Sequence, residues 1–317
     1  MNEKHEQTLP LRIGTRGSPL ARLQANMVAD ALRAAFPVLA APTAIEIVII
    51  TSTGDRIQDR PLAEIGGKGL FIKEIEEAIH ANTVDIGVHS MKDVETVLAE
   101  GTEIAAILPR ADPRDALIAA EARKLSDLPP GAVVGTTSVR RRAFLLAQRP
   151  DLKIITFRGN VESRLRKLND GLADATLLAV AGLKRLKMDD LLVGALDIDD
   201  MPPAVGQGAI GIQARSADCR PGAAIATWLA AIDDRDSRLC VTAERAMLAK
   251  VDGSCGTPVS GLAQIRDGVL HLTAKLASDD GREVVAASAS GSADNAAAIG
   301  TRVGAELLAQ AGQNVTL

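Results

Sequence analysis

A strand that runs directly into a helix is predicted by LRIGTRGSPLARLQANMVADALRAAF, residues 11–36. The apolar run at 11–15 is typical of a buried strand, and the helical pattern occupies 18–36. Ser18 and Pro19 mark the start of the helix, because serine caps the free amides of the first turn and proline suits the first helical position. The stretch therefore predicts one β–α unit.

The same alternation continues along the first third of the chain. Apolar runs predict strands at 45–51 and 85–90, and apolar residues at helical spacing predict a helix at 69–83 between them. Strands that alternate with helices form parallel α/β sheets. Such sheets bind ligands beyond the carboxyl ends of their strands, where the free amides of the helix starts attract anions.

Residues 132–180 repeat this scheme, with a helix that Ser138 opens. The predicted strands and helices are, in chain order, 132–137, 138–150, 152–157, 161–171 and 174–180. In both copies a strand leads to Ser or Thr and Arg at a helix start, and the third strand begins with Asp. The duplication predicts two α/β domains whose helix starts face one cleft.

The last part of the chain follows another pattern. A helical stretch at 236–251 is followed by apolar strands with Asp-Gly turns at 267–268 and 280–281, and then by a final helix over 293–312. Asp-Gly between alternating strands is typical of hairpins. We expect a small α+β domain here.

The composition excludes several classes of protein. Hydrophobic residues make up 47% and charged residues 24% of the chain, as in ordinary globular proteins. The net charge of −4 and the aromatic content of 2% do not favour nucleic acid as a partner. No run approaches the roughly 18 apolar residues of a membrane span, so we expect no membrane contact.

Cysteine and histidine give no metal or disulfide pattern. The three cysteines, at 219, 240 and 255, are unevenly spaced and odd in number, and the histidines at 5, 80, 89 and 271 form no ligand motif. The start, MNEKHEQTLPLRIG, lacks the features of a signal peptide. We expect a cytoplasmic, reducing location.

Arginines gather at predicted strand ends and helix starts. They are Arg16, Arg140, Arg141, Arg142, Arg158 and Arg164. A solvated basic face is the simple interpretation. Cations oppose the dipole of a helix start, however, and arginine's planar fork suits carboxylate or phosphate. A small anionic ligand is therefore favoured.

HSMKD, residues 89–93, follows the third predicted strand. Asp93 could cap a helix or pair with Lys92; in an arginine-lined cleft it could stabilise a cationic intermediate or move protons. Two glycine motifs are rejected as nucleotide sites: GGKGLF (66–71) has no Ser or Thr after its lysine, and no helix opens after GQGAIG (206–211).

The turn-rich stretch DGSCGTPVSG, 252–261, places Cys255 on a loop. A structural cysteine at a tight corner and a functional thiol both remain open on these residues alone, because loops on rigid scaffolds often carry function.

The chain resembles the porphobilinogen deaminase family, also called hydroxymethylbilane synthases, from about residue 11 to the end. The motifs, in the family's order and spacing, are LRIGTRGSPLA, IGGKGLF, DIGVHSMKD, DPRDAL, GTTSVRRR, FRGNVESRL, LAVAGLKRL, MPPAVGQGAIGI, VTAERAML and DGSCGTP. The resemblance implies a dipyrromethane cofactor joined to Cys255 by a thioether. It also implies that four porphobilinogen units are joined head to tail with loss of ammonia, and that the linear tetrapyrrole is then released by hydrolysis.

The resemblance also implies which residues act. Asp93 is the expected catalytic carboxylate, which would stabilise the azafulvene cation left when ammonia departs. The expected carboxylate binders are Arg16, Lys68, Lys92, Ser138, Arg140, Arg141, Arg158, Arg164 and Arg185. The expected supporting residues are Ser18, Asp55, Phe71, Ser90, Thr136, Asn160 and Gln207, and no metal is expected.

The family's architecture implies two domains that resemble periplasmic binding proteins and flank a cleft, plus a small α+β C-terminal domain. The expected boundaries are 1–110 with 204–230, 111–203, and 231–317. Pro113 and the pair at 202–203 lie near the crossings, where a hinge is plausible. The chain departs from the family at Glu64, where lysine is frequent, and at Ser254, where glycine is frequent.

Three other functions each match part of the sequence pattern. A non-catalytic two-lobed binding protein for a small polyanion shares the expected architecture but leaves the cysteine loop unexplained. A cysteine hydrolase needs a base beside the thiol, and neither His89 nor His271 lies in a motif for that task. A DNA-binding regulator needs a recognition helix, which the sequence does not offer. The resemblance implies porphobilinogen as the substrate and a monomeric enzyme. Cys219 and Cys240 match no functional position and are interpreted as structural.

Overall fold

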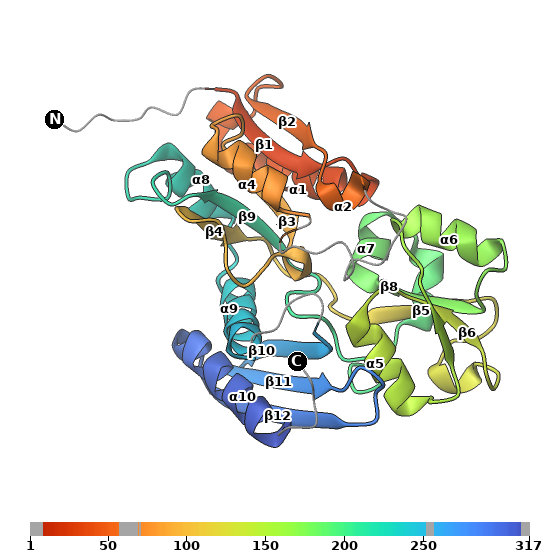
Figure 1. The fold of residues 1–317 in the computed structure, drawn as a ribbon. Coiled ribbons are helices and arrows are strands. Elements are labelled where there is room, and N and C mark those ends of the chain that lie inside the picture. Colours follow the sequence, from red (N-terminus) through yellow and green to blue (C-terminus); the bar gives the residue numbers. More distant parts are fainter. Residues whose placement is uncertain (1–8, 57–68, 70, 252–256, 312–317) are drawn as a thin grey trace. The chain divides into compact units, whose positions relative to one another are not determined.

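The structure, a computed structural model, describes residues 9–56, 69, 71–251 and 257–311, without the side chains of 55 and 56. These residues form two compact units (Figure 1). Unit 1 contains the described residues up to 110 together with 209–238, and unit 2 contains 111–208 and the described residues from 239. The sequence predicts three domains, whereas the structure divides into two units. Unit 2 contains two separate sheets, and the division of this unit into two domains stays a prediction.

Unit 1 is built on one five-stranded sheet with the order β2-β1-β3-β9-β4. Its strands are β1 (Leu11–Arg16), β2 (Ile45–Ile50), β3 (Ile86–Ser90), β4 (Thr102–Ile107) and β9 (Ile210–Arg215). Its helices are α1 (Pro19–Ala35), α2 (Thr53–Arg56), α4 (Lys73–His80) and α8 (Ala224–Ile232), with the short 3-10 helices η1 (Pro37–Leu39) and η2 (Met91–Asp93).

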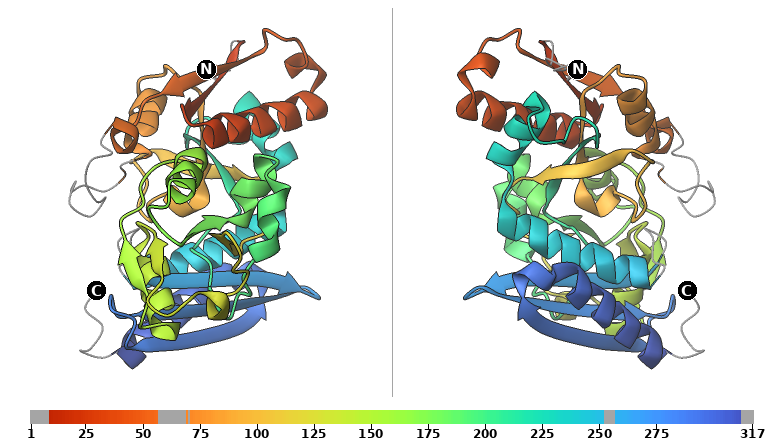
Figure 2. Two further views of the ribbon diagram at one scale, coloured as in Figure 1. Left: turned by 90° about the vertical axis from the view of Figure 1, so that its right-hand side faces the viewer. Right: turned by 90° about the vertical axis from the view of Figure 1, so that its left-hand side faces the viewer.

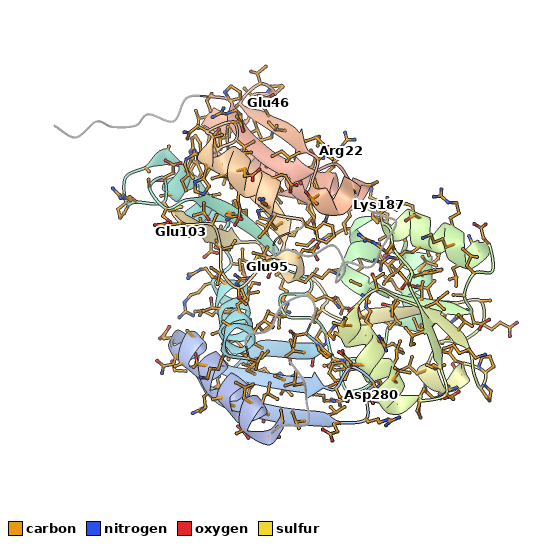
Figure 3. The ribbon with its side chains drawn as sticks, viewed as in Figure 1. Arg22, Glu46, Glu95, Glu103, Lys187 and Asp280 are labelled. Atoms are coloured by element: carbon orange, nitrogen blue, oxygen red, sulfur yellow. The ribbon has the colours of Figure 1, made fainter. Side chains whose placement is uncertain are left out.

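Strand β1 is parallel to both β2 and β3, whereas β9 is antiparallel to β3 and β4. Helices α1 and α8 pack against one another, and buried Val28, Leu32 and Trp228 of these helices join Ile13 of β1 in one apolar core. Charged side chains such as Arg22 and Glu46, which are exposed, lie on α1 and β2 (Figure 3).

The first sheet of unit 2 repeats this arrangement in the order β5-β8-β6-β7. Its strands are β5 (Asp115–Ala119), β6 (Val133–Gly135), β7 (Lys153–Ile155) and β8 (Ala175–Ala179). Its helices are α5 (Val139–Gln148), α6 (Val161–Asn169) and α7 (Val180–Arg185), with η3 (Leu125–Asp127) and η4 (Asp189–Gly194).

The predicted duplication is confirmed by strand pairing. In each sheet the first strand of the repeat, β1 or β6, lies between the second and the third and is parallel to both. In each sheet an antiparallel strand then pairs with the third: β9 with β3, and β5 with β8. The carboxyl ends of the parallel strands therefore share one edge in each sheet, where the helix starts lie.

The second sheet of unit 2 is antiparallel, in the order β10-β11-β12. It contains β10 (Val259–Arg266), β11 (Val269–Ala277) and β12 (Val284–Ser292), and is followed by η5 (Ala293–Asn295) and α10 (Ala296–Ala311). Figure 2 shows α10 along this sheet, and it packs on β11 and β12. Helix α9 (Arg235–Lys250) contributes Met247 to the same core. The predicted α+β class of this part is confirmed.

Both Asp-Gly turns are also present. Asp267 and Gly268 have φ of 52° and 75° between β10 and β11, the left-handed pair that a type I′ hairpin turn requires. Gly281 has φ of 72°, and an added Cβ there would lie 2.4 Å from the Ala143 carbonyl of α5. The second turn therefore packs on the other sheet's helix layer at a contact only glycine permits.

One predicted helix is shorter than expected. The pattern predicts a helix over 69–83, but α4 covers Lys73–His80. Gly69 and Asn82 have φ of 77° and 55°, in the left-handed region that interrupts a right-handed helix. None of the helices in the described ranges is long and apolar enough to cross a membrane.

Candidate active site

The carboxyl edge of the unit 1 sheet brings together side chains from three segments. Arg16 ends β1, Ser18 opens α1, and Ser90 ends β3 just before Lys92 and Asp93 in η2. All five line one pocket, to which Phe71 is added from the turn before α4. The structure thus joins six of the sequence-predicted site residues.

Arg16 is held between an aromatic ring and a carboxylate. Its guanidinium carbon lies 4.1 Å from the Phe71 ring centroid, a cation–π contact. Its Nη1 lies 3.9 Å from Asp93 Oδ2, and the two side chains keep 22% and 33% of their surface exposed. Because this distance exceeds a hydrogen bond, Arg16 and Asp93 attract one another while both stay accessible to a ligand.

Ser90 depends on a residue that the sequence did not single out. Gln24 of α1 is buried, and its Nε2 donates to Ser90 Oγ at 2.9 Å. The sequence feature that could have indicated this contact is the polar Gln24 on a helix face that otherwise carries the apolar Ala21, Ala25 and Val28. A buried amide on an apolar face needs a partner, and here that partner is a pocket side chain.

His89 lies beneath the pocket on β3 and is buried. Burial lowers the pKa of His89 to about 4, the Gln213 side chain opposes that shift, and the charge of Arg16 adds to it. Gln213 of β9 in turn donates to Glu76 of α4 at 2.9 Å. A neutral imidazole at pH 7 therefore keeps the floor of the pocket free of a second cation beside Arg16.

The matching edge of unit 2 contains a buried ionic cluster around Asp115. Arg140 and Arg141, at the start of α5, each place Nη2 at 2.7 Å from this carboxylate. Burial would raise the pKa of Asp115, but the charges and hydrogen bonds of the two arginines outweigh it and hold the pKa far below the ordinary value. The sequence placed both arginines as ligand binders and did not anticipate Asp115.

Gln207 and Arg185 lie in the same unit. Gln207 Nε2 donates to Asp115 Oδ1 at 2.9 Å and to the Pro113 carbonyl at 2.6 Å. Arg185, at the end of α7, donates from Nη2 to the Gly208 carbonyl at 2.6 Å, and its buried Nε has no hydrogen-bond partner in the described part of the chain. Burial lowers the pKa of Arg185 to about 10, so it remains a cation at neutral pH.

The remaining predicted residues of unit 2 hold the helix starts. Ser138 Oγ accepts from Arg141 N at 3.3 Å, Thr136 Oγ1 accepts from Ser138 N at 3.2 Å, and Asn160 Oδ1 accepts from Ser163 N at 2.9 Å. Arg158 is buried, and Arg164 donates from Nε to the Gly159 carbonyl at 2.9 Å. Ser138 and Asn160 therefore act as N-caps.

Two sequence models of one family match the chain. The first, described as porphobilinogen deaminase, dipyromethane cofactor binding domain, matches residues 11–221, and the second, porphobilinogen deaminase, C-terminal domain, matches 238–309. The chain belongs to the porphobilinogen deaminase family.

Individual relatives support the same family assignment. The porphobilinogen deaminase of Paracoccus denitrificans is 52% identical over 98% of this chain and 97% of its own length. The chloroplastic porphobilinogen deaminase of Pisum sativum is 49% identical over 98% of this chain and 84% of its own length. Among solved structures, a nutrient binding protein from Burkholderia cenocepacia bound to methionine is similar over 76% of this chain and 95% of that one, at 14% identity and a TM-score of 0.43.

The cations at the edge of the first unit 2 sheet fit the dipyrromethane cofactor of a porphobilinogen deaminase. Such a group carries carboxylates, and the buried Nε atoms of Arg140 and Arg185 are donors with no hydrogen-bond partner in the described part of the chain. Carboxylates satisfy such guanidinium donors well. No set of three or more His, Cys, Asp and Glu side chains within the described ranges is arranged to bind a metal ion.

Three predicted site residues cannot be placed. Lys68 and Cys255 lie outside the described residues, and of Asp55 only the backbone, in α2, is described. Their roles stay predictions. The other two cysteines are described: Cys240 is buried and Cys219 is half-buried, and burial together with Glu103 and Asp218 raises the pKa of Cys219 to about 12. A thiol with such a pKa is unreactive at neutral pH.

Proposed function

We infer that this chain is a hydroxymethylbilane synthase, a transferase that joins four porphobilinogen molecules onto a dipyrromethane primer and then releases the linear tetrapyrrole by hydrolysis. The observation that carries this inference is the family match over residues 11–221 and 238–309. The pocket of unit 1 supports it, because a carboxylate and an arginine stand side by side in it.

Asp93 is the proposed catalytic carboxylate. Positive charge develops on porphobilinogen as ammonia leaves, and a fixed anion nearby lowers the free energy of that charge. Asp93 is half-exposed in the pocket, so its oxygens can also accept hydrogen bonds from pyrrole N–H groups and orient the attacking ring. Arg16, beside it, would bind a carboxylate of the same ring.

The cations of unit 2 are the proposed binders of further carboxylates. Each porphobilinogen carries an acetate and a propionate, so every condensation adds two negative charges to the bound chain. The proposed binders are Arg140, Arg141, Arg158, Arg164 and Arg185, with Lys68 and Lys92 from the other part of the chain. Arg185 supports this role most directly, since its buried Nε has no protein partner among the described residues.

Cys255 is the proposed attachment point of the primer. When bound, the dipyrromethane supplies the nucleophilic pyrrole carbon on which the chain is extended. The chain's own contribution is a thiol for the thioether and cations for the carboxylates. Cys255 is the remaining cysteine once buried Cys240 and the high-pKa Cys219 are set aside.

Intact-protein mass spectrometry tests the proposed function. The wild-type mass should exceed the sequence mass by two linked pyrrole units, and Cys255→Ser should remove that addition. Cys219→Ser and Cys240→Ser are matched controls that should keep it. A wild type that carries no addition, even after incubation with porphobilinogen, and releases no ammonia contradicts the proposal.

We also propose that the enzyme works as a cytoplasmic monomer without a nucleic-acid partner. The net charge of −4 and the aromatic content of 2% support the last point. Sedimentation velocity measures the oligomeric state, and a dimer at micromolar concentration would contradict the monomer.

A further inference from the structure

Asp115 lies at the ligand-facing edge of its sheet because of strand direction. It is the first residue of β5, and β5 runs antiparallel to β8, with Asp115 opposite Ala179 at the end of β8. The start of an antiparallel strand lies beside the carboxyl end of its neighbour. Asp115 therefore shares the edge at which β6 ends and α5 begins.

Four donor groups contact the two oxygens of Asp115, and the residue is 0% exposed. Arg140 Nη2 lies 2.7 Å from Oδ2. Arg141 places Nη2 at 2.7 Å from Oδ1 and Nε at 3.3 Å from Oδ2. Gln207 Nε2 lies 2.9 Å from Oδ1. The carboxylate thus fixes both guanidinium planes at once, with Gln207 holding the carboxylate itself.

The far side of each guanidinium is anchored too. Arg140 Nη1 donates to the Pro202 carbonyl, and Arg141 Nη1 donates to the Leu177 carbonyl at 2.8 Å. A planar fork that is bound on two sides has one orientation. Of the donors on this pair, the buried Nε of Arg140 has no hydrogen-bond partner within the described residues.

The cluster carries one positive charge in excess, since a single carboxylate faces two guanidiniums. Arg140 and Arg141 are both buried, and a buried net charge is costly unless a counter-ion meets it. A fixed cationic site with a spare N–H donor has the properties that a carboxylate ligand requires.

We propose that Asp115 is a positioning residue: it holds Arg140 and Arg141 so that the pair presents one positive charge and the Arg140 Nε–H to a carboxylate of the pyrrole chain. Gln207 assists by holding Asp115. This inference rests on the proposed function, because it takes the bound pyrrole chain as the source of the carboxylate.

Three variants of the full-length enzyme test the proposal. Asp115→Asn removes the charge that orders the pair, and Gln207→Met removes only the amide that holds Asp115. Asp112→Asn is the matched control: Asp112 pairs with Arg114 at 2.8 Å and with Lys184 at 3.6 Å, and not with the arginine pair. For each, we would measure the fraction of chains that carry the cofactor by intact mass, the KM and kcat of that fraction, and the Tm.

We expect Asp115→Asn to raise KM for porphobilinogen about tenfold, as the loss of one well-placed charged hydrogen bond does, and to lower cofactor occupancy. Gln207→Met should raise KM about threefold with kcat unchanged, a smaller effect because Gln207 acts on the arginines only through Asp115. Asp112→Asn should match the wild type. If Asp115→Asn does not fold, Gln207→Met tests the proposal alone: a raised KM with an unchanged kcat supports it, and a wild-type KM contradicts it.

A lower Tm with wild-type KM and occupancy in both Asp115→Asn and Gln207→Met would overturn the proposal, because Asp115 would then only stabilise the fold. Failure of the proposed function looks different, since the wild type itself would lack the cofactor and would form no tetrapyrrole.

Discussion

Arg16 and Asp93 face each other in the unit 1 pocket at 3.9 Å between Nη1 and Oδ2, without a hydrogen bond between them. A tight bidentate pair would neutralise both groups, whereas at this spacing both side chains stay partly exposed to a ligand of opposite charge. The Phe71 ring, 4.1 Å from the Arg16 guanidinium, helps to hold that spacing. The pair can therefore serve an anionic substrate that becomes cationic at its reacting carbon.

Asp93→Asn should leave the free energy of unfolding close to that of the wild type and lower kcat by about a hundredfold or more, since an amide cannot stabilise the developing cation. Asp93→Glu should retain part of the activity, because the charge is kept and only displaced. Steady-state release of tetrapyrrole measures both. Full activity in Asp93→Ala would show that the carboxylate has no catalytic role.

Arg185→Gln should raise KM for porphobilinogen about tenfold, the size expected for one hydrogen bond to a charged group, while kcat changes little. The neighbouring Lys184→Gln is the control, because Lys184 is half exposed and pairs with Asp112. Equal KM values for the two variants would mean that Arg185, with its buried Nε, serves the fold alone.

His89 should make stability depend on pH. Its pKa is lowered from 6.5 to about 4 in the folded protein, so the unfolded chain binds the proton first as the pH falls. Stability is therefore fully present above pH 6.5 and is lost as the pH falls toward 4, by about 3 kcal/mol for this residue.

Urea unfolding at pH 4.5 and pH 7 measures that loss. His89→Gln, which does not titrate, should show a smaller difference between the two pH values than the wild type. An identical difference in both proteins would assign the acid sensitivity to other groups.

Gly135→Ala should destabilise unit 2. An added Cβ would lie 2.4 Å from Cγ of the Phe157 ring, and such overpacking costs about 2 kcal/mol. The double variant Gly135→Ala/Phe157→Leu should lose less free energy of unfolding than the sum of the two single-variant losses, because the smaller leucine leaves room for the added methyl group. Strict additivity in urea unfolding would place the strain elsewhere.

Several short elements were not predicted from the sequence. Strand β5 has five residues, α7 has six, and Val180, predicted to end a strand, begins α7. Runs of this length fit strand and helix equally well. By contrast, the caps at Ser18 and Ser138 located two helix starts to the residue, since capping depends on neighbours in the chain alone.

The candidate site likewise contains residues that local sequence patterns predict and residues that only tertiary contacts reveal. The sequence placed Arg16, Asp93 and Arg140 at strand ends and helix starts, but not Asp115, whose arginine partners lie 25 and 26 residues away and whose glutamine partner lies 92 residues away. Gln24, which meets Ser90 from 66 residues away, was missed for the same reason.

By itself, then, the sequence determined the α/β duplication, the hairpin turns, the family and the residue types that carry the chemistry, because periodicity, caps and motifs are local properties of the chain. Only the tertiary structure decided that Arg140 and Arg141 share a buried carboxylate, that His89 is neutral, and that Arg16 and Asp93 stand 3.9 Å apart. Those properties depend on burial and on partners that strand pairing brings together, and neither is encoded at neighbouring positions.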